Sequence, residues 1–171
     1  LVFNKTAKVV GGCLQCGVNG GGPLHPKTQE FIQVVFGIEM GQGYGMTETA
    51  CSGTVQTLGT PFFGRIGAPW VSIQSKLLAT EIQDKSRIPY NPNDSKHYNE
   101  SCMGRGELLW QGASIMAGYL LKPDKTEETL YRDEDGVWLR SGDVGVWTKD
   151  GDIQIVDRVK NIVKLKGGEY C

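Results

Sequence analysis

The chain has 171 residues, of which 39% are hydrophobic and 22% are charged, and its formal net charge is −1. This is the composition of an ordinary globular protein and excludes a fibrous or fully disordered chain. The near-zero charge gives no electrostatic basis for binding nucleic acid or an anionic membrane, and no apolar run is long enough to suggest a transmembrane segment.

Glycine is unusually frequent, with 24 of 171 residues, about 14% against a usual ~7%. It is clustered without a period, as in Gly20-Gly21-Gly22 and in Gly41-Gln42-Gly43-Tyr44-Gly45. Because glycine has no Cβ, such clusters favour backbone that lies close to a ligand. The sequence therefore indicates a small-molecule ligand.

Residues 1–57 alternate between helical and extended patterns. A helix is expected to end near Val10-Gly11-Gly12, since glycine is common just after a helix. We predict a strand at 14–18, a helix at 27–36 and a strand at 38–41. This alternation predicts an α/β layer.

From Gly59 onward the pattern changes to short β-rich runs. Strands are predicted at 71–80, 106–110, 137–139, 144–148 and 153–156, with turns at 133–136 and 149–152. This half of the chain is predicted to form a small barrel or meander.

Two segments of this half differ from the strands. Residues 84–101 are polar and contain two prolines, so we predict an exposed loop. Asp124 is followed three residues later by Glu127, a variant of the capping box that predicts a short helix to about Tyr131. We interpret this helix as purely structural.

Five cysteines at irregular spacing argue against a disulfide framework and favour a reducing compartment. Cys13 and Cys16 have the spacing of a metal or redox pair, but no second ligand pair accompanies them. The strand predicted there would also point the two thiols to opposite faces. We interpret them as packing residues and assign them no further role.

The glycine cluster before Thr47 matches neither of two common nucleotide-binding motifs. A Walker A loop needs a Gly-Lys pair, which the sequence lacks, and the dinucleotide fingerprint needs glycine where Met46 stands. The cluster leads instead to Thr47-Glu48-Thr49. Thr47 could donate to a phosphate oxygen and Glu48 could bind Mg²⁺, although the same residues could simply begin a helix.

Two later segments could also bind a nucleotide. Asp143 follows a glycine in Ser141-Gly142-Asp143, where its carboxylate could accept hydrogen bonds from a ribose diol or from local turn amides. Basic residues recur at positions 158, 160, 164 and 166. They could face an anionic ligand or form a solvated cationic surface.

Several motifs in one order give the chain a resemblance to the adenylate-forming acyl-CoA synthetases, and among them most to the long-chain fatty acid CoA ligases. The resemblance covers nearly the whole chain, and the ending Lys166-Gly167-Gly168-Glu169-Tyr170 is similar to the long-chain branch. The motifs that carry it lie at 11–12, 20–24, 41–49, 106–112, 118–119, 135–139, 141–143 and 157–160.

The resemblance implies an α/β fold that forms part of the large N-terminal domain of an acyl-CoA synthetase. Residues 1–57 would be the end of the α/β AMP-binding subdomain with its parallel sheet, and residues 58–156 a small β-barrel-like subdomain. Residues 157–171 would form the hinge, at Lys160, and the truncated start of a C-terminal domain. The chain would then be an internal fragment, with the family's phosphate loop upstream and its adenylation lysine downstream.

The resemblance also implies a two-step reaction with ATP, Mg²⁺ and coenzyme A. The carboxylate of a fatty acid would attack the α-phosphate of Mg-ATP to give acyl-AMP and pyrophosphate. The thiol of coenzyme A would then displace AMP. Gly167 stands where the family lines the channel for the pantetheine arm.

For the adenine side of the site, the resemblance implies that Gly21, Gly22 and Pro23 form a wall beside the base. Tyr44 and Gly45 would lie on the neighbouring loop. Acetate-activating relatives carry a tryptophan at the position of Gly45, which closes the acyl pocket. Glycine would leave room for a long acyl chain there.

For the ribose and phosphates, the resemblance implies that Thr47 holds the α-phosphate and that Glu48 binds magnesium. Asp143 would bind the ribose hydroxyls, Ile155 would pack near the nucleoside, and Arg158 would contact ribose or phosphate. Of these, Thr47, Glu48 and Arg158 would be the catalytic residues. The side-chain types suit adenylyl transfer, which depends on positioning and on stabilisation of charge.

On this basis we expect an intracellular enzyme, cytoplasmic or peripheral on an organelle membrane, and we expect the 171-residue fragment alone to be inactive. Two alternatives remain open. One is another adenylating enzyme, such as an aryl-CoA ligase or a peptide-synthetase adenylation domain. The other is a non-catalytic nucleotide-binding module.

Overall fold

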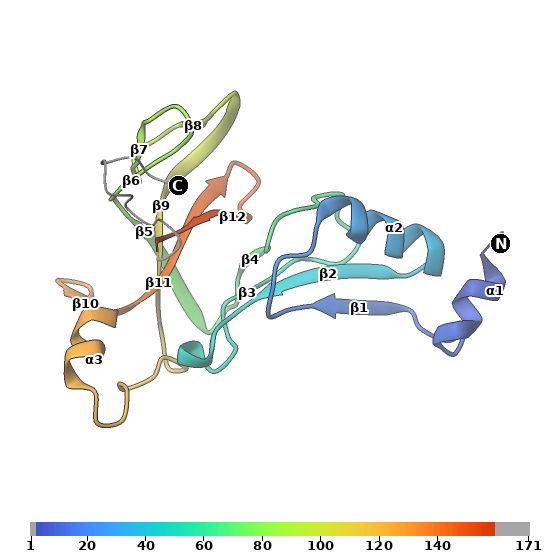
Figure 1. Cartoon of the computed structure of the whole chain (residues 1–171), viewed down its shortest axis with the longest axis horizontal. Coiled ribbons are helices and arrows are strands. Elements are labelled where there is room, and N and C mark those ends of the chain that lie inside the picture. The colour runs from blue at the N-terminus through green and yellow to red at the C-terminus, as the bar shows by residue number, and fades with distance from the viewer. Residues whose placement is uncertain (1–2, 160–171) are drawn as a thin grey trace, which may run out of the picture.

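A four-stranded and a six-stranded sheet dominate the computed structural model, which describes residues 3–159 (Figure 1). The chain begins with α1 (Asn4–Ala7) and a 3₁₀ turn, η1 (Lys8–Val10). The turn ends at Gly11, whose φ of 89° is the left-handed conformation common after helices. The predicted helix end is confirmed.

The first sheet contains a parallel pair, β1 (Cys16–Asn19) and β2 (Glu39–Tyr44), joined by α2 (Pro26–Phe36), which lies alongside β2 (Figure 1). Proline at the first position begins α2, and Gly37 with φ of 66° ends it. Gln29 fixes the helix to the sheet, because its Nε2 donates to the Met40 carbonyl at 2.7 Å. The predicted β-α-β order is confirmed.

Two short antiparallel strands, β3 (Thr54–Val55) and β4 (Ala68–Pro69), complete the first sheet. Between β2 and β3 lies a second 3₁₀ turn, η2 (Thr47–Thr49). The pairing of β3 with the end of β2 extends β2 to Tyr44, three residues beyond the predicted strand end. Tyr44 therefore lies on a strand and not on the loop where we expected it.

The second sheet is antiparallel and holds most of the apolar core. Its side chains with no exposed surface include Leu108, Trp110, Leu139 and Ile153. The predicted β-rich half is therefore confirmed. The strands are β5 (Ile73–Leu78), β8 (Lys96–His97), β9 (Glu100–Gly112), β10 (Leu130–Asp133), β11 (Gly136–Thr148) and β12 (Ile153–Arg158).

The strands predicted at 137–139 and 144–148 form one long strand, β11, whose pairing with β9 shifts register between Arg140 and Val144. The irregular stretch contains Gly142, whose φ is 73°. This bulge keeps the strand continuous while changing the direction of its side chains. Asp143 lies inside it.

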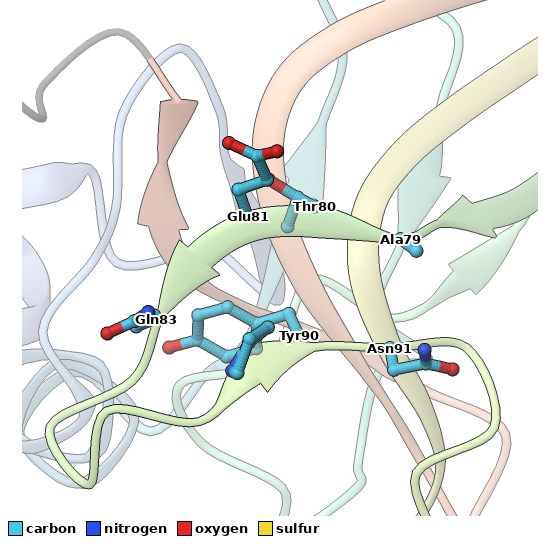
Figure 2. A pocket seen from close by; sticks show the side chains of 7 residues that line it. Ala79, Thr80, Glu81, Gln83, Tyr90 and Asn91 are labelled. Atoms are coloured by element: carbon cyan, nitrogen blue, oxygen red, sulfur yellow. The ribbon is translucent and has the colours of Figure 1, made fainter.

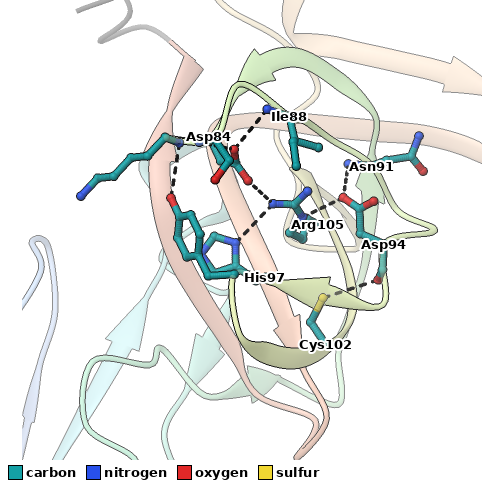
Figure 3. Close-up of polar contacts among 10 residues, drawn as sticks. Asp84, Ile88, Asn91, Asp94, His97, Cys102 and Arg105 are labelled. Atoms are coloured by element: carbon teal, nitrogen blue, oxygen red, sulfur yellow. Dashed lines mark hydrogen bonds and ion pairs between the residues drawn. The ribbon is translucent and has the colours of Figure 1, made fainter.

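The prediction of an exposed loop at 84–101 is only partly confirmed: most of these residues are exposed, but the segment also contains short strands and a buried carboxylate. The segment includes the end of a hairpin, β6 (Thr80–Gln83) and β7 (Pro89–Tyr90), and then β8. Arg105, 3% exposed, pairs with Asp84 at 2.7 Å and with Asp94 at 2.7 Å, as Figure 3 shows. Ion pairing allows Arg105 and Asp84 to be buried, which composition alone does not indicate.

The helix near Asp124 also differs from the prediction. α3 (Pro123–Thr129) begins two residues earlier than expected and has Lys122 at its N-cap, with no side-chain cap hydrogen bond. Asp124 therefore lies in the first turn and does not form a capping box. Proline at the first helical position fixes the start instead.

Cys13 and Cys16 are exposed and form no disulfide, so their interpretation as packing residues is wrong. Cys16 opens β1 and Cys13 precedes that strand. The division of the chain into units at 57 and 156 stays a prediction. Among residues 3–159, no helix has the length and apolar character needed to cross a bilayer.

Candidate active site

The C-terminal ends of β1 and β2 lie at the same edge of the first sheet, because the two strands are parallel and Asn19 is in register with Gln42. In α/β sheets this edge is where ligands commonly bind. The chain leaves β2 at Tyr44 and enters the turn that contains Thr47 and Glu48. The topology therefore places the predicted glycine motif at the edge expected for a ligand.

The hydroxyl group of Thr49 closes this turn. It accepts a hydrogen bond from the Met46 amide at 3.2 Å and donates one to the Met46 carbonyl at 3.0 Å. Thr49 is 1% exposed, whereas Thr47 is exposed and Glu48 is half-buried. The turn thus leaves the hydroxyl of Thr47 available to a ligand in solution.

Gly45 lies against the chain that returns toward β3. A Cβ at this position would lie 2.3 Å from the carbonyl oxygen of Cys51, so a larger residue requires the backbone to move. Ala50 and Cys51 themselves have φ of 50° and 63°, left-handed values that cost energy for residues with a Cβ. The close approach gives Gly45 a structural role in addition to the room that we expect it to leave for a substrate.

Asp143 is held in the bulge of β11 by local contacts. Its amide donates to the Ser141 hydroxyl at 3.0 Å. The buried carboxylate of Glu107 accepts the Gly142 amide at 3.2 Å and binds Arg140 Nη2 at 2.6 Å. Glu107 therefore anchors both sides of the turn that precedes Asp143.

Three predicted site residues meet at one carboxylate. The hydroxyl of Tyr44 donates to Asp143 Oδ2 at 2.6 Å, and Nε of Arg158 donates to Asp143 Oδ1 at 2.7 Å. Arg158 and Asp143 are cross-strand partners on β12 and β11, whereas Tyr44 comes from the other sheet. The ring of Tyr44 also packs 5.8 Å from that of Trp110, measured between centroids. The cluster joins the two sheets.

The surroundings of Tyr44 and Arg158 keep both side chains protonated. Burial raises the pKa of Tyr44, and so do the charge of Asp143 and the hydrogen bond to it, so the phenol keeps its proton and donates. The hydrogen bond to Asp143, followed by its charge, raises the pKa of Arg158. The arrangement is a carboxylate that accepts from one neutral and one cationic donor.

Glu48 contacts a different part of the chain. Its Oε1 accepts a hydrogen bond from the Tyr119 hydroxyl at 2.5 Å, and its backbone carbonyl accepts the Met116 amide at 2.9 Å. The turn after β2 is therefore bound to the segment that precedes α3.

The predicted adenine wall, Gly21-Gly22-Pro23, is an exposed turn directly after β1. Asn19 Nδ2 donates to the Gly22 carbonyl at 2.9 Å, and the Leu24 amide donates to Gln42 Oε1 at 2.7 Å. Gly21 has a φ of 81°. These contacts fix the turn beside the C-terminal end of β2.

Of the remaining predicted site residues, Ile155 is within the described part of the chain. Ile155 lies on β12, half-buried, and packs against the core cluster around Leu108 and Trp110. Lys160 and Gly167 lie outside the described residues.

A cavity of about 460 Å³ lies at the β6–β7 hairpin (Figure 2). Its lining consists of Ala79, Thr80, Glu81, Gln83, Pro89, Tyr90 and Asn91. None of the predicted site residues lines it, so we do not identify it as the nucleotide site.

Sequence reasoning included Glu107 and Tyr119 only as members of motifs and gave them no role. Their partners are distant in sequence, 33 residues from Glu107 to Arg140 and 71 residues from Glu48 to Tyr119. The only local signals are the Gly-Glu pair that opens the motif at 106–112 and the glycine before Tyr119. Neither signal identifies the partner.

The donor set around Glu48 fits magnesium that is bound together with a substrate. Among residues 3–159, no group of three or more His, Cys, Asp or Glu side chains could hold a metal ion. Mg²⁺ is often bound by one or two carboxylates and substrate phosphates. Glu48, next to the exposed hydroxyl of Thr47, matches that mode.

Comparison with known proteins identifies the family of the chain. Residues 2–120 match the family model described as AMP-binding enzyme. The chain is 39% identical over 171 residues to long chain acyl-CoA synthetase 8 of Arabidopsis thaliana, and 36% identical over 170 residues to long-chain-fatty-acid–CoA ligase 6 of Homo sapiens. Each match covers 99% of this chain and 22% of the relative's length.

A solved structure has the same fold. The O-succinylbenzoate coenzyme A synthetase of Bacillus subtilis, in complex with ATP and magnesium ion, matches with a TM-score of 0.60 and 25% identity, over 91% of this chain and 29% of that one. The chain therefore belongs to the AMP-binding enzyme family. The resemblance to long-chain acyl-CoA synthetases and the fold class expected from the sequence are both confirmed.

Proposed function

We propose that the chain is an internal segment of a long-chain fatty acid CoA ligase, which activates a fatty acid with ATP and transfers it to coenzyme A. The observation that carries the proposal is the meeting of Tyr44 and Arg158 at Asp143, since Tyr44 ends the strand that leads into the turn of Thr47 and Glu48. The names of the relatives at 36–39% identity support the substrate class.

In this proposal Asp143 accepts hydrogen bonds from the ribose hydroxyls. Each of its carboxylate oxygens already accepts one bond, from Tyr44 or from Arg158, and each oxygen has a second lone pair for a ribose hydroxyl. Asp143 is 5% exposed, whereas the Arg158 side chain is largely exposed. Arg158 therefore moves aside to admit the ribose and can then contact ribose or phosphate.

The phosphates would lie at the turn after β2. Thr47 donates from its exposed hydroxyl to the α-phosphate, and the carboxylate of Glu48 holds magnesium. When bound, magnesium supplies neutralisation of the phosphate charge and activation of the α-phosphate toward the fatty acid carboxylate. Gly21, Gly22 and Pro23 flank the adenine, with Ile155 near the nucleoside.

The remaining roles follow from the same assignment. Lys160 is the hinge, Gly167 lines the coenzyme A channel, and the boundaries at 57 and 156 separate the subdomains. The 171-residue chain alone is inactive, because it spans 22% of its relatives' length. Two similar Arabidopsis relatives are named peroxisomal, which supports an intracellular enzyme, cytoplasmic or peripheral on an organelle membrane.

The test is acyl-AMP formation by the full-length protein, which is measured through the pyrophosphate that the reaction releases. The substrates are short, medium and long fatty acids, an aromatic acid and an amino acid. We expect the highest rate with long fatty acids and strong loss in Asp143→Asn, with Asp135→Asn, an exposed turn residue, as the matched control. A maximum with the aromatic or amino acid would favour another adenylating enzyme, and no reaction with any acid would favour a non-catalytic module.

A further inference from the structure

Tyr119 binds the proposed magnesium ligand from a distant part of the sequence. Its hydroxyl donates to Glu48 Oε1 at 2.5 Å, and the amide of Met116, three residues earlier, donates to the Glu48 carbonyl at 2.9 Å. Glu48 is thus held through both its backbone and its side chain by one short segment. Hydrogen bonds to ionised carboxylates are among the strongest in proteins.

The position of Tyr119 is itself fixed by α3. The Tyr119 amide donates to the hydroxyl of Thr126 at 2.9 Å, and that hydroxyl donates to the Lys122 carbonyl at 3.0 Å. The ammonium group of Lys125 lies 4.2 Å from the centre of the Tyr119 ring. One hydrogen bond and one cation–π contact therefore hold the backbone and ring of Tyr119 against the helix.

Gly118 allows this packing. A Cβ at Gly118 would lie 2.8 Å from Cγ2 of Thr126, and its φ of 156° is one that residues with a Cβ rarely adopt. Gly118 and Tyr119 thus form a unit in which the glycine permits the approach and the tyrosine supplies the hydroxyl. The helix that we interpreted as purely structural is connected to Glu48 by this unit.

We propose that Tyr119 is a positioning residue, which holds the carboxylate of Glu48 in the orientation needed to bind magnesium on the phosphates of ATP. The inference rests on the proposed function. A glutamate has three rotatable bonds, so fixing Oε1 removes much of the freedom that would otherwise be lost when the metal binds.

The experiment measures nucleotide binding by calorimetry in the full-length protein, which separates positioning from catalysis. ATP is titrated at several Mg²⁺ concentrations, and AMP is titrated without metal. The variants are Tyr119→Phe, Glu48→Gln and the matched control Tyr131→Phe, which removes a phenol hydroxyl from β10, just after the same helix. Thermal unfolding of each variant is recorded in parallel.

We expect Tyr119→Phe to weaken Mg²⁺-dependent binding of ATP by about tenfold, as loss of one hydrogen bond to a charged group would do. AMP affinity and the unfolding temperature should stay at wild-type values, and Tyr131→Phe should alter neither nucleotide's affinity. Glu48→Gln should remove the Mg²⁺ dependence.

Two results would overturn the inference while leaving the proposed function in place. One is unchanged Mg²⁺ dependence in Tyr119→Phe when Glu48→Gln has lost it. The other is an equal loss of ATP and AMP affinity with a lower unfolding temperature, which would assign Tyr119 a structural role only. Failure of the wild-type protein to bind either nucleotide would instead refute the proposed function, and the inference with it.

Discussion

Nε of Arg158 lies 2.7 Å from Oδ1 of Asp143, and this contact joins a side chain that is 62% exposed to one that is 7% exposed. Ion pairs with such an exposed partner contribute little to folding, about 0–1 kcal/mol. The pair is therefore better suited to binding a ligand than to stabilising the sheet. Water can replace the guanidinium when it leaves the carboxylate.

Arg158→Ala should accordingly reduce nucleotide affinity while leaving the fold intact. We expect AMP binding by the full-length protein to weaken by about tenfold, through the loss of one charged hydrogen-bond donor. Arg158→Lys should recover part of the affinity, because it keeps the charge but not the planar guanidinium. Calorimetric titration with AMP checks the affinity, and an unfolding temperature well below that of the wild type would contradict the assignment.

Glu107→Gln should disturb Asp143 indirectly. The substitution weakens the contacts of the buried Glu107 side chain with Arg140 and with the Gly142 amide, which hold the turn before Asp143. We expect faster hydrogen exchange at amides 140–144 and an AMP affinity lower by a few-fold to about tenfold, consistent with weakening of charged hydrogen bonds. Asp133→Asn, which changes a carboxylate at the end of β10, serves as the control. Normal exchange at 140–144 together with weaker AMP binding would exclude this indirect route.

Arg105→Met should destabilise the hairpin formed by β6 and β7. It leaves the buried Asp84 carboxylate without its cation, and breaking a buried ion pair costs about 3–5 kcal/mol. Adding Asp84→Asn should recover part of that loss, because an amide oxygen can still accept the backbone N–H groups of Ser86 and Ile88. Hydrogen exchange of the β6 and β9 amides in the full-length protein measures the local free energy of opening. Additive losses in the double variant would argue against coupling.

Ionisation of Tyr90 should lower the stability of the folded protein at alkaline pH. Burial, followed by the charges of Tyr98 and Asp157, raises the pKa of Tyr90 to about 12, against about 10 in an unfolded chain. Since the folded-state pKa is the higher one, the contribution to stability is complete below about pH 10 and is lost as the pH rises toward about 12. Exchange of the β7 and β9 amides between these pH values should reveal the decline. Tyr90→Phe should show a shallower decline, and identical slopes would refute this.

Local rules predicted much of the fold. Pro26 and Gly37 mark the ends of α2, and the predicted helix at 27–36 differs from it by one residue. The apolar runs of β5, β9 and β12 were also visible in the sequence. β9 and β12 extend beyond the predicted ends along their paired neighbours, whereas β5 is shorter than the predicted strand at 71–80. For Asp143 and Arg158, collinear motifs predicted the residues, and the structure adds their contact.

The features that escaped prediction depend on tertiary contacts. Residues 84–101 were predicted to be a loop because they are polar and contain two prolines. Their short strands and the pairing of Asp84 and Asp94 with Arg105 depend on a side chain from a later strand. The bulge in β11 is defined by its pairing with β9, which lies earlier in the chain. The anchoring of Glu48 depends on the distant hydroxyl of Tyr119. No local pattern contains the partner in any of these cases.

The close approach of Gly45 to Cys51 also limits how the acyl specificity of such an enzyme could be changed. A side chain introduced at position 45 to shorten the substrate pocket would first meet the protein's own backbone at Cys51. Ala50 and Cys51 are already left-handed and have little freedom to yield. A shift toward shorter acids would therefore need paired changes in the residues 45 and 50–52, so specificity at this position would evolve through the loop and the pocket together.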